Sequence, residues 1–349
     1  MKKRVLIVGS AENSAGGVSS VIKLMKKMPV WEEFECYWLG TQIQRNYFWK
    51  FWYAVKANVI ALFIIWRYDI VHFHTVPDKI CLIIQLPIFI LSLIGKKKVI
   101  MHLHVGNQLE REKERNLSIF RWCMKKSNVV VVLSNHLRDI LVKKYSDIKT
   151  KKIVLYNACE DVTPISYEMH DKTILFAGAI NKNKACDLLI DAFKSVHDEF
   201  GDWKLQLLGC GPLESECKSK VMSLGLSEFV EFTGYLEGTE KQAYFKKAGI
   251  YAMCSFLEGF PMVVLEAWAY GVPVVSTPVG GLVDVLEDGK NAYVFNFGNV
   301  EELSSQIKKM IKNSEHRRLM SEYCKVFVAD NFSKQIINRQ IENLYAELS

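Results

Sequence analysis

The chain has 349 residues, of which half are hydrophobic and about a quarter are charged. This composition is typical of a globular protein, and the length exceeds what one hydrophobic core usually supports, so we expect two domains. Lys and Arg outnumber Asp and Glu by 26 to 13 over residues 1–165, whereas they number 19 against 25 over residues 166–349. The basic first half predicts an anionic partner, namely phospholipid headgroups, a lipid diphosphate or nucleic acid, unless its lysines only keep the surface soluble.

Two apolar segments are too short for the targeting roles that such segments often have. The run at residues 5–8 follows three basic residues but ends at Gly9, so we expect a buried strand and no signal peptide. Residues 80–94 fall short of the roughly 20 residues of a membrane span and predict a buried helix. The nine cysteines include no Cys-x-x-Cys pair, which favours reduced thiols, no zinc site and a cytoplasmic location.

Short apolar runs alternate with helical stretches along the first half of the chain. After the strand at 5–8, a glycine turn at Gly16 and Gly17 precedes a helix over 18–28. Further strands are expected at 70–74, 99–104, 129–133 and 153–156. Short, continuously apolar strands are typical of a buried parallel sheet.

The alternation stops over residues 157–171, a mixed polar stretch with Pro164 that predicts a linker, and then resumes. Strands are expected at 173–177, 204–208, 230–233, 250–253 and 273–276, with helices at 185–200, 213–224, 241–248 and 262–269. We therefore predict an α/β protein with two Rossmann-like, doubly wound domains, 1–160 and 161–332, that face a central cleft. A last helix over 333–349 is expected to pack back on the first domain. Ligands of such sheets bind beyond the carboxyl ends of the strands.

Two glutamates frame the most informative segment. Glu258 precedes Gly259 and Pro261, which break the chain just before a helix, and Glu266 lies about one turn inside that helix. The free N–H groups at Met262 to Val264 would attract a diphosphate, while the carboxylates accept hydrogen bonds from sugar and ribose hydroxyls. Taken alone, the two residues are equally compatible with solvated carboxylates on a helix surface.

The segment is not alone. It resembles the EX7E motif of family 4 glycosyltransferases, which are retaining enzymes of the GT-B fold. Further resemblances cover most of residues 153–300. They comprise Leu207-Leu208-Gly209-Cys210-Gly211-Pro212, Phe232-Thr233-Gly234-Tyr235, Ala267-Trp268-Ala269-Tyr270-Gly271, Gly280-Gly281, Glu287-Asp288-Gly289 and Asn157.

The resemblance implies a site for a nucleotide diphosphate sugar in the second domain. Lys184 matches the lysine that contacts the donor diphosphate, Glu258 positions the sugar and Glu266 the ribose. The implied donor-binding residues are Gly16, Gly17, Gly178, Lys184, Gly209, Tyr235, Glu258, Gly259, Phe260, Met262, Val263 and Glu266. Two positions depart from the family, because Ala179 replaces the usual arginine and Ala185 the usual glycine. The missing arginine puts diphosphate affinity in doubt, and Lys182 is a candidate to compensate.

In the first domain, Gly16 and Gly17 resemble the family's glycine loop near the diphosphate, although a plain strand-to-helix turn has the same pattern. His104 matches the histidine that faces the transferred sugar, and His74 and His102 are alternatives on nearby strand positions. The implied catalytic residues are thus His104, Glu258 and Lys184. They would assist cleavage of the bond between the sugar and the diphosphate, with charge stabilisation of the leaving group as the main effect.

The sequence contains no Asp-x-Asp motif, so we expect no metal and no cofactor apart from the donor substrate, with UDP favoured over GDP. The acceptor is expected to be a glycan, with a lipid-linked glycan favoured, in bacterial surface polysaccharide or lipopolysaccharide synthesis. Aromatic and basic residues from Arg45 to Lys56 predict a face that binds the inner surface of the cell membrane, unless this helix packs on its own sheet.

Other classes of protein fit less of the sequence. A non-hydrolysing sugar-nucleotide epimerase of similar fold and a catalytically weak scaffold that binds nucleotide sugars remain alternatives, and Ala179 leaves room for the second. A dehydrogenase is disfavoured because no Gly-x-Gly-x-x-Gly follows the first strand. A nucleic-acid partner fits the basic half but not the glutamate motif, so we expect none.

Overall fold

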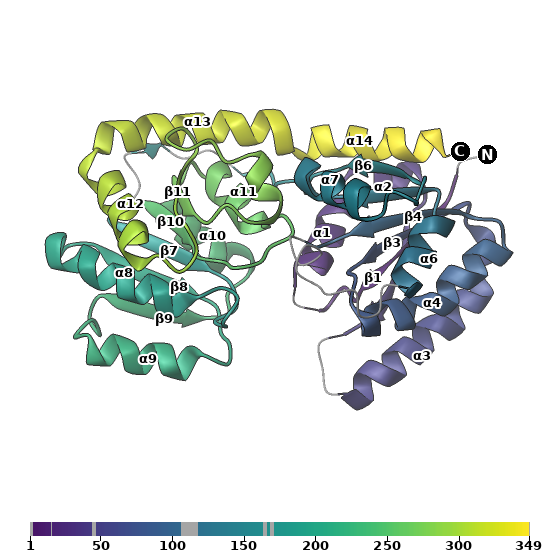
Figure 1. The fold of residues 1–349 in the computed structure, drawn as a ribbon, viewed down its shortest axis with the longest axis horizontal. Coiled ribbons are helices and arrows are strands. Elements are labelled where there is room, and N and C mark those ends of the chain that lie inside the picture. The colour runs from purple at the N-terminus through teal and green to yellow at the C-terminus, as the bar shows by residue number, and fades with distance from the viewer. Residues whose placement is uncertain are drawn as a thin grey trace. The chain divides into compact units, whose positions relative to one another are not determined.

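The computed structural model describes residues 3–14, 16–43, 47–105, 118–162, 166–167 and 171–348. The chain divides into two compact units (Figure 1). The first unit runs to Ala158 and takes up the chain again at Lys334, and the second unit extends from Cys159 to Ser333. In the segment predicted as a linker, Pro164 lies outside the described residues.

A six-stranded parallel sheet forms the centre of the first unit. Its strands are β1 (Val5–Ser10), β2 (Tyr37–Gln42), β3 (Ile70–Thr75), β4 (Lys98–Leu103), β5 (Val129–Val132) and β6 (Lys151–Val154). They lie in the order β2, β1, β3, β4, β5, β6. Sequence analysis missed β2, because this edge strand alternates buried with partly exposed residues and lacks a continuous apolar run.

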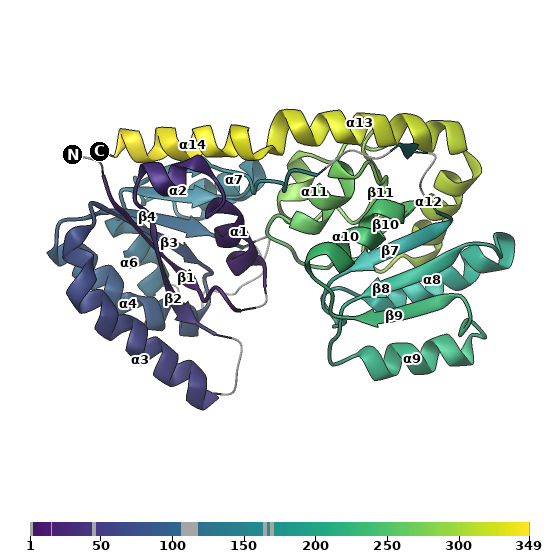
Figure 2. The same ribbon diagram turned by 180° about the vertical axis from the view of Figure 1, so that it is seen from behind.

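Helices cover both faces of this sheet (Figure 2). They are α1 (Gly17–Met25), α2 (Pro29–Glu33), α3 (Tyr47–Ile64), α4 (Lys79–Ile94), α6 (Ser118–Lys126), α7 (Asn135–Lys144) and α14 (Lys334–Glu347), with a 3₁₀ turn η1 (Ile65–Arg67) after α3. Phe73 and Met101 belong to the core that α3, α4 and α6 cover. The opposite face meets α14, whose Asn338 Oδ1 accepts a hydrogen bond of 2.9 Å from the Val30 N–H of α2.

The helix α4 corrects the prediction of a fully buried helix over 80–94. Its inner face is buried, but Ile80 and Ile94 are 62% and 65% exposed. The neighbouring segment Phe48–Arg67 is long and apolar enough to cross a membrane by length and composition, and only 22% of that window is buried. Apolarity all round a helix does not reveal which face the protein covers, so sequence alone could not separate these cases.

The second unit is also built on a six-stranded parallel sheet. Its strands are β7 (Thr173–Ala177), β8 (Lys204–Leu208), β9 (Val230–Gly234), β10 (Ile250–Met253), β11 (Val274–Ser276) and β12 (Ala292–Val294). Its helices are α8 (Cys186–Glu199), α9 (Glu214–Ser223), α10 (Gly238–Lys247), α11 (Met262–Ala269), α12 (Val300–Lys312) and α13 (Ser314–Phe332), with a 3₁₀ turn η3 (Gly280–Asp284).

The strand order of this second sheet is β12, β11, β10, β7, β8, β9. The chain starts at β7, adds β8 and β9 on one side, and then returns to place β10 on the other side of β7. This order is that of the Rossmann fold, with its switch point between β7 and β10. The loops that follow β7 and β10 are therefore where a ligand is expected.

Candidate functional site

Asn183 joins the two loops at the switch point of the second sheet. Its side chain accepts a hydrogen bond of 3.0 Å from the Leu257 N–H and donates one of 2.9 Å to the Leu257 carbonyl. The Phe256 N–H also donates to the Asn183 carbonyl at 2.8 Å. These three bonds fix the loop after β10 against the loop after β7. Sequence analysis gave Asn183 no role, because residues 74 positions apart carry no local signal of their contact.

Lys184 and Glu258 form an ion pair at this junction. The Lys184 Nζ lies 2.5 Å from the Glu258 Oε1, and the two side chains are 18% and 14% exposed. Gly178 lies beside the lysine, since a Cβ there would meet the Lys184 Cε at 3.4 Å. The structure thus brings together three residues that the sequence had placed in one donor site. Because both side chains are partly exposed, the lysine can exchange the carboxylate for a phosphate group, and the glutamate can exchange the lysine for hydroxyl groups.

The residue after this lysine has an uncommon backbone. Ala185 has a φ of +47°, in the left-handed region, immediately before α8. Only glycine adopts this region without a steric cost, so the glycine usual in the resembled family has a physical reason. Ala185 keeps the turn despite its Cβ.

Three glycines lie at the ends of adjacent strands β7, β8 and β9. Gly209 has a φ of +142°, and a Cβ on it would lie 1.9 Å from the Gly178 carbonyl oxygen. Its N–H donates to the Gly234 carbonyl at 2.8 Å. Tyr235 follows and is 60% exposed, with its hydroxyl 3.3 Å from the Glu237 Oε2. Gly209 thus lets the backbones of neighbouring strands approach closely, and the exposed ring of Tyr235 lies next in the chain after Gly234.

A second close approach supports the start of α11. A Cβ on Gly280 would lie 2.1 Å from the Glu258 carbonyl oxygen, and the Gly281 N–H donates to the Gly259 carbonyl at 2.6 Å. Phe260 is buried, with its ring 5.5 Å from that of Phe332, so only its backbone is available to a ligand.

The amides at the start of α11 differ in part from the prediction. The Val264 N–H bonds to the Pro261 carbonyl at 3.2 Å and is not available to a ligand. Met262 and Val263 precede it in the first turn, where a helix offers its own N–H groups no acceptor. Of the three amides predicted to be free at this helix start, these two therefore remain as candidates to bind an anion.

Glu266 forms an ion pair with Lys241 of α10. Burial raises the pKa of the Glu266 carboxyl, whereas Lys241 opposes that shift. The lysine partner was not predicted, although a cation near a buried carboxylate is a general requirement. In the second unit, each of the two motif glutamates is thus held by one lysine.

In the first unit, the predicted glycine loop follows β1. Gly16 has a φ of +135°, which favours glycine, and Ser19 holds the turn by donating to the Ser14 carbonyl at 2.6 Å. A Cβ on Gly17 would meet nothing within 4 Å. Backbone conformation thus explains Gly16, whereas the position of Gly17 has open space around it.

His104 follows the end of β4, and its ring stacks on those of His74 from β3 and His102 from β4. Its Nε2 lies 2.8 Å from the Nδ1 of His74, and His72 Nδ1 lies 2.8 Å from the Tyr345 hydroxyl. Burial lowers the pKa of His72 and of His104 to about 3, and lowers those of His74 and His102 well below the usual range. All four rings are neutral near pH 7. Sequence analysis did not consider His72, although its spacing of two from His74 places both on one face.

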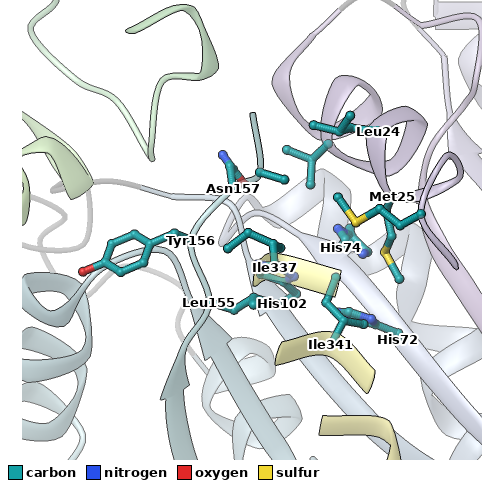
Figure 3. Close-up of a pocket in the computed structure, with 13 residues that line it drawn as sticks. Leu24, Met25, His72, His74, His102, Leu155, Tyr156, Asn157, Ile337 and Ile341 are labelled. Carbon is teal, nitrogen blue, oxygen red and sulfur yellow. The ribbon is translucent and has the colours of Figure 1, made fainter. Parts of the chain in front are cut away.

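One nitrogen from each of His72, His74 and His102 lies within 4.8 Å of the others, in an arrangement that could hold a metal ion. These rings line a cavity inside the first unit, together with Met25 of α1 and Ile341 of α14 (Figure 3).

Comparison with known proteins finds glycosyltransferases of similar sequence. A family model described as glycosyl transferases group 1 matches residues 164–327. An uncharacterized glycosyltransferase of Methanocaldococcus jannaschii is 30% identical over 231 residues, which are 66% of this chain and 62% of that protein. The N-acetyl-alpha-D-glucosaminyl L-malate synthase of Bacillus anthracis is 27% identical over 80% of this chain and 75% of its own. An amylovoran biosynthesis glycosyltransferase of Erwinia amylovora is 25% identical over 64% of this chain and 63% of its own.

Solved structures show the same fold. The crystal structure of HepE from Anabaena in complex with UDP and glucose has a TM-score of 0.77, with 17% identity, and covers 99% of this chain and 100% of its own. Together with the two parallel six-stranded sheets, these matches establish the GT-B fold. Residues 164–327, which lie in the second unit, thus match the group 1 glycosyl transferases, and the chain is similar to family 4-like glycosyltransferases of GT-B fold.

Proposed function

We propose that the protein transfers a sugar from a nucleotide diphosphate sugar to a glycan acceptor, with retention of the anomeric configuration. The observation that carries this proposal is the Lys184–Glu258 pair, held by Asn183 at the switch point of the second sheet. A salt bridge that only stabilises the fold can lie anywhere on the surface. A pair that exchanges its partners for a phosphate and a sugar hydroxyl must lie where the ligand binds, which in this fold is the switch point.

In the proposed mechanism, the donor diphosphate takes over Lys184 and lies against the amides of Met262 and Val263. Glu258, released from the lysine, accepts hydrogen bonds from the sugar hydroxyls, and Glu266 accepts them from the ribose. The bond between the sugar C1 and the diphosphate oxygen breaks, and its electron pair leaves with the diphosphate. The acceptor hydroxyl attacks C1 from the same face and gives its proton to the departing phosphate. Lys184 stabilises the charge that develops on the leaving group.

UDP is the favoured nucleotide. HepE, which has the same fold, was solved with UDP and glucose. In this chain, the open ring of Tyr235 at the end of β9 offers a stacking surface for a base. His104 is proposed to face the transferred sugar, as the family resemblance implies, and no cofactor besides the donor is proposed for the transfer step.

A lipid-linked acceptor is favoured by the outer surface of α3 and α4, which pack together through a bond of 3.1 Å from Asn58 Nδ2 to the Ile84 carbonyl. Large apolar side chains are exposed there: Phe48, Trp49, Phe51, Trp52, Val59, Leu62, Phe63, Trp66, Ile80, Ile83, Ile90 and Ile94. Lys56 and Lys79 are exposed on the same helices, and Arg67 is exposed on the turn η1 that follows α3. Aromatic side chains next to basic ones fit the headgroup region of an anionic membrane, which would place the protein peripherally on the inner leaflet. Arg45, part of the predicted face, lies outside the described residues.

Vesicle flotation tests the membrane part of the proposal. We expect binding to vesicles with anionic lipid, weaker binding to neutral vesicles, and loss of binding in the double variant Phe48→Ser and Trp52→Ser. Val326→Ser is the matched control, since Val326 is 60% exposed on the second unit and should leave flotation unchanged. Equal flotation of all three proteins would contradict a membrane role for α3.

A nucleotide-release screen tests the reaction itself. The protein would be offered UDP-, GDP- and ADP-sugars with a membrane extract as acceptor. We expect UDP release from one donor, its loss in Glu258→Gln, and wild-type release in Glu228→Gln, which changes an exposed carboxylate. The anomeric signal of the product in NMR distinguishes retention from inversion. Nucleotide binding without release would favour the scaffold, and conversion of the donor sugar without an acceptor would favour the epimerase.

A further inference from the structure

Three clustered histidines of the first unit have ring nitrogens that the fold does not satisfy. Among the described residues, His72 Nε2, His74 Nε2 and both nitrogens of His102 are buried without a hydrogen-bond partner. His72, His74 and His102 are at most 3% exposed. A buried polar atom without a partner lowers stability, so several of them in one place point to a group that binds there.

The backbone places these nitrogens together. His72 and His74 alternate on β3, and His74 pairs in register with His102 of β4. The rings stack, with centroids of His72 and His102 5.4 Å apart and an interplanar angle of 12°. Strand spacing and pleat therefore direct three imidazoles to the same side of the sheet, where one nitrogen of each lies within 4.8 Å of the others.

The Nδ1 atoms of His72 and His74 have hydrogen-bond partners, as the second nitrogen of a metal-bound histidine usually does. The Tyr345 hydroxyl of α14 lies 2.8 Å from His72 Nδ1, and His104 Nε2 lies 2.8 Å from His74 Nδ1. If Nδ1–H of each ring donates to these partners, both Nε2 atoms, which have no partner, keep a free electron pair for a ligand. Metal-bound histidines almost always have such a second hydrogen bond.

We propose that His72, His74 and His102 bind one Zn²⁺ ion in the first unit. Three imidazoles are a common ligand set for zinc, with a water or hydroxide as fourth ligand. Met25 and Ile341 line the same cavity as the three rings (Figure 3). Because the ion fixes the tautomer of His74, it also fixes His104 Nε2 as a hydrogen-bond acceptor. The ion thus orients His104 through His74 and acts as a positioning group.

Metal binding is tested on the tag-free full-length protein after chelation and dialysis. We expect one equivalent of Zn²⁺ to bind and to raise the melting temperature, and Co²⁺ in its place to give the visible absorption of a tetrahedral site. His102→Asn should abolish both signals. Tyr345→Phe, which removes only the orienting hydroxyl, should weaken affinity about 10-fold. His316→Asn, a histidine of the second unit, is the control and should leave binding unchanged.

Circular dichroism of His102→Asn separates loss of the site from loss of the fold, and Tyr345→Phe provides a milder variant if that protein is unfolded. Absence of stoichiometric Zn²⁺ and Co²⁺ binding in the folded wild-type protein would overturn the proposal and leave the cavity to water. Binding that survives in His102→Asn but falls in His316→Asn would overturn it as well.

Discussion

Each of the two units is built on its own parallel six-stranded sheet, but the polar clusters lie at different places on the two sheets. In the second unit, Lys184 and Glu258 lie in loops beyond the carboxyl ends of the strands, are partly exposed and carry opposite charges. In the first unit, His72 and His102 lie within the strands, are buried and are neutral near pH 7. Strand ends thus provide charged groups that a soluble ligand can reach, whereas a strand face provides neutral groups whose role depends on what covers them.

The largest effect on activity should come from removing the positive charge of Lys184 in the second unit. Lys184→Gln is expected to lower kcat/KM for nucleotide release roughly 100- to 1,000-fold, because the leaving diphosphate loses its cation. Lys182→Gln, two residues earlier on the same loop and exposed, should change it less than 10-fold. Equal losses in both variants would mean that Lys182 shares the role of Lys184.

The next effect contrasts two glycines. Gly209→Ala should destabilise the second unit by about 2–4 kcal/mol, because its Cβ would lie 1.9 Å from the Gly178 carbonyl oxygen and φ is +142°. Gly17→Ala should change stability by less than about 0.5 kcal/mol, since nothing lies within 4 Å of the added Cβ. Urea unfolding of both variants measures the difference, and a tolerated Gly209→Ala would show that the two loops can separate.

The buried histidines predict an acid-sensitive first unit. The pKa of His72 falls from 6.5 to about 3 on burial, so the unfolded chain binds more protons between these values. Stability is therefore fully present above pH 6.5 and falls as the pH falls, by about 1.4 kcal/mol per pH unit for this histidine.

Pulse proteolysis in urea with EDTA, at pH 7.5 and 5.5, measures this loss through peptides of the first unit. The loss should be smaller in His72→Asn by about 1.4 kcal/mol. Peptides of the second unit provide the reference. An identical pH dependence in wild type and variant would mean that His72 is protonated in the folded protein.

The smallest effect concerns Ala185. Ala185→Gly relieves a left-handed φ of +47° but loosens the unfolded chain, so we expect a net stabilisation of up to about 1 kcal/mol. The melting temperature of the variant checks the sign. A decrease would mean that the Ala185 methyl group, which is buried, contributes more by packing than its backbone costs.

The sequence by itself determined the alternation of strands and helices, the two units and the motif that contains Glu258 and Glu266. These features are local: apolar runs define strands, and Gly259 with Pro261 defines where α11 begins. The spacing of two between His72 and His74 also encodes a common face, although His72 was not among the predicted residues. Such patterns depend only on residues close in the chain, so they can be read without a structure.

Only the tertiary structure decided which distant residues meet. The contact of Asn183 with Leu257 and that of Lys241 with Glu266 join loops and helices that the sheet order brings together. The contact between the Tyr345 hydroxyl and His72 depends on α14, which covers one face of the first sheet. The exposure of α4 was likewise undetermined, because an apolar sequence gives the same signal whether protein or another surface covers it. Pairing across the sheet is a global property, and no local pattern encodes it.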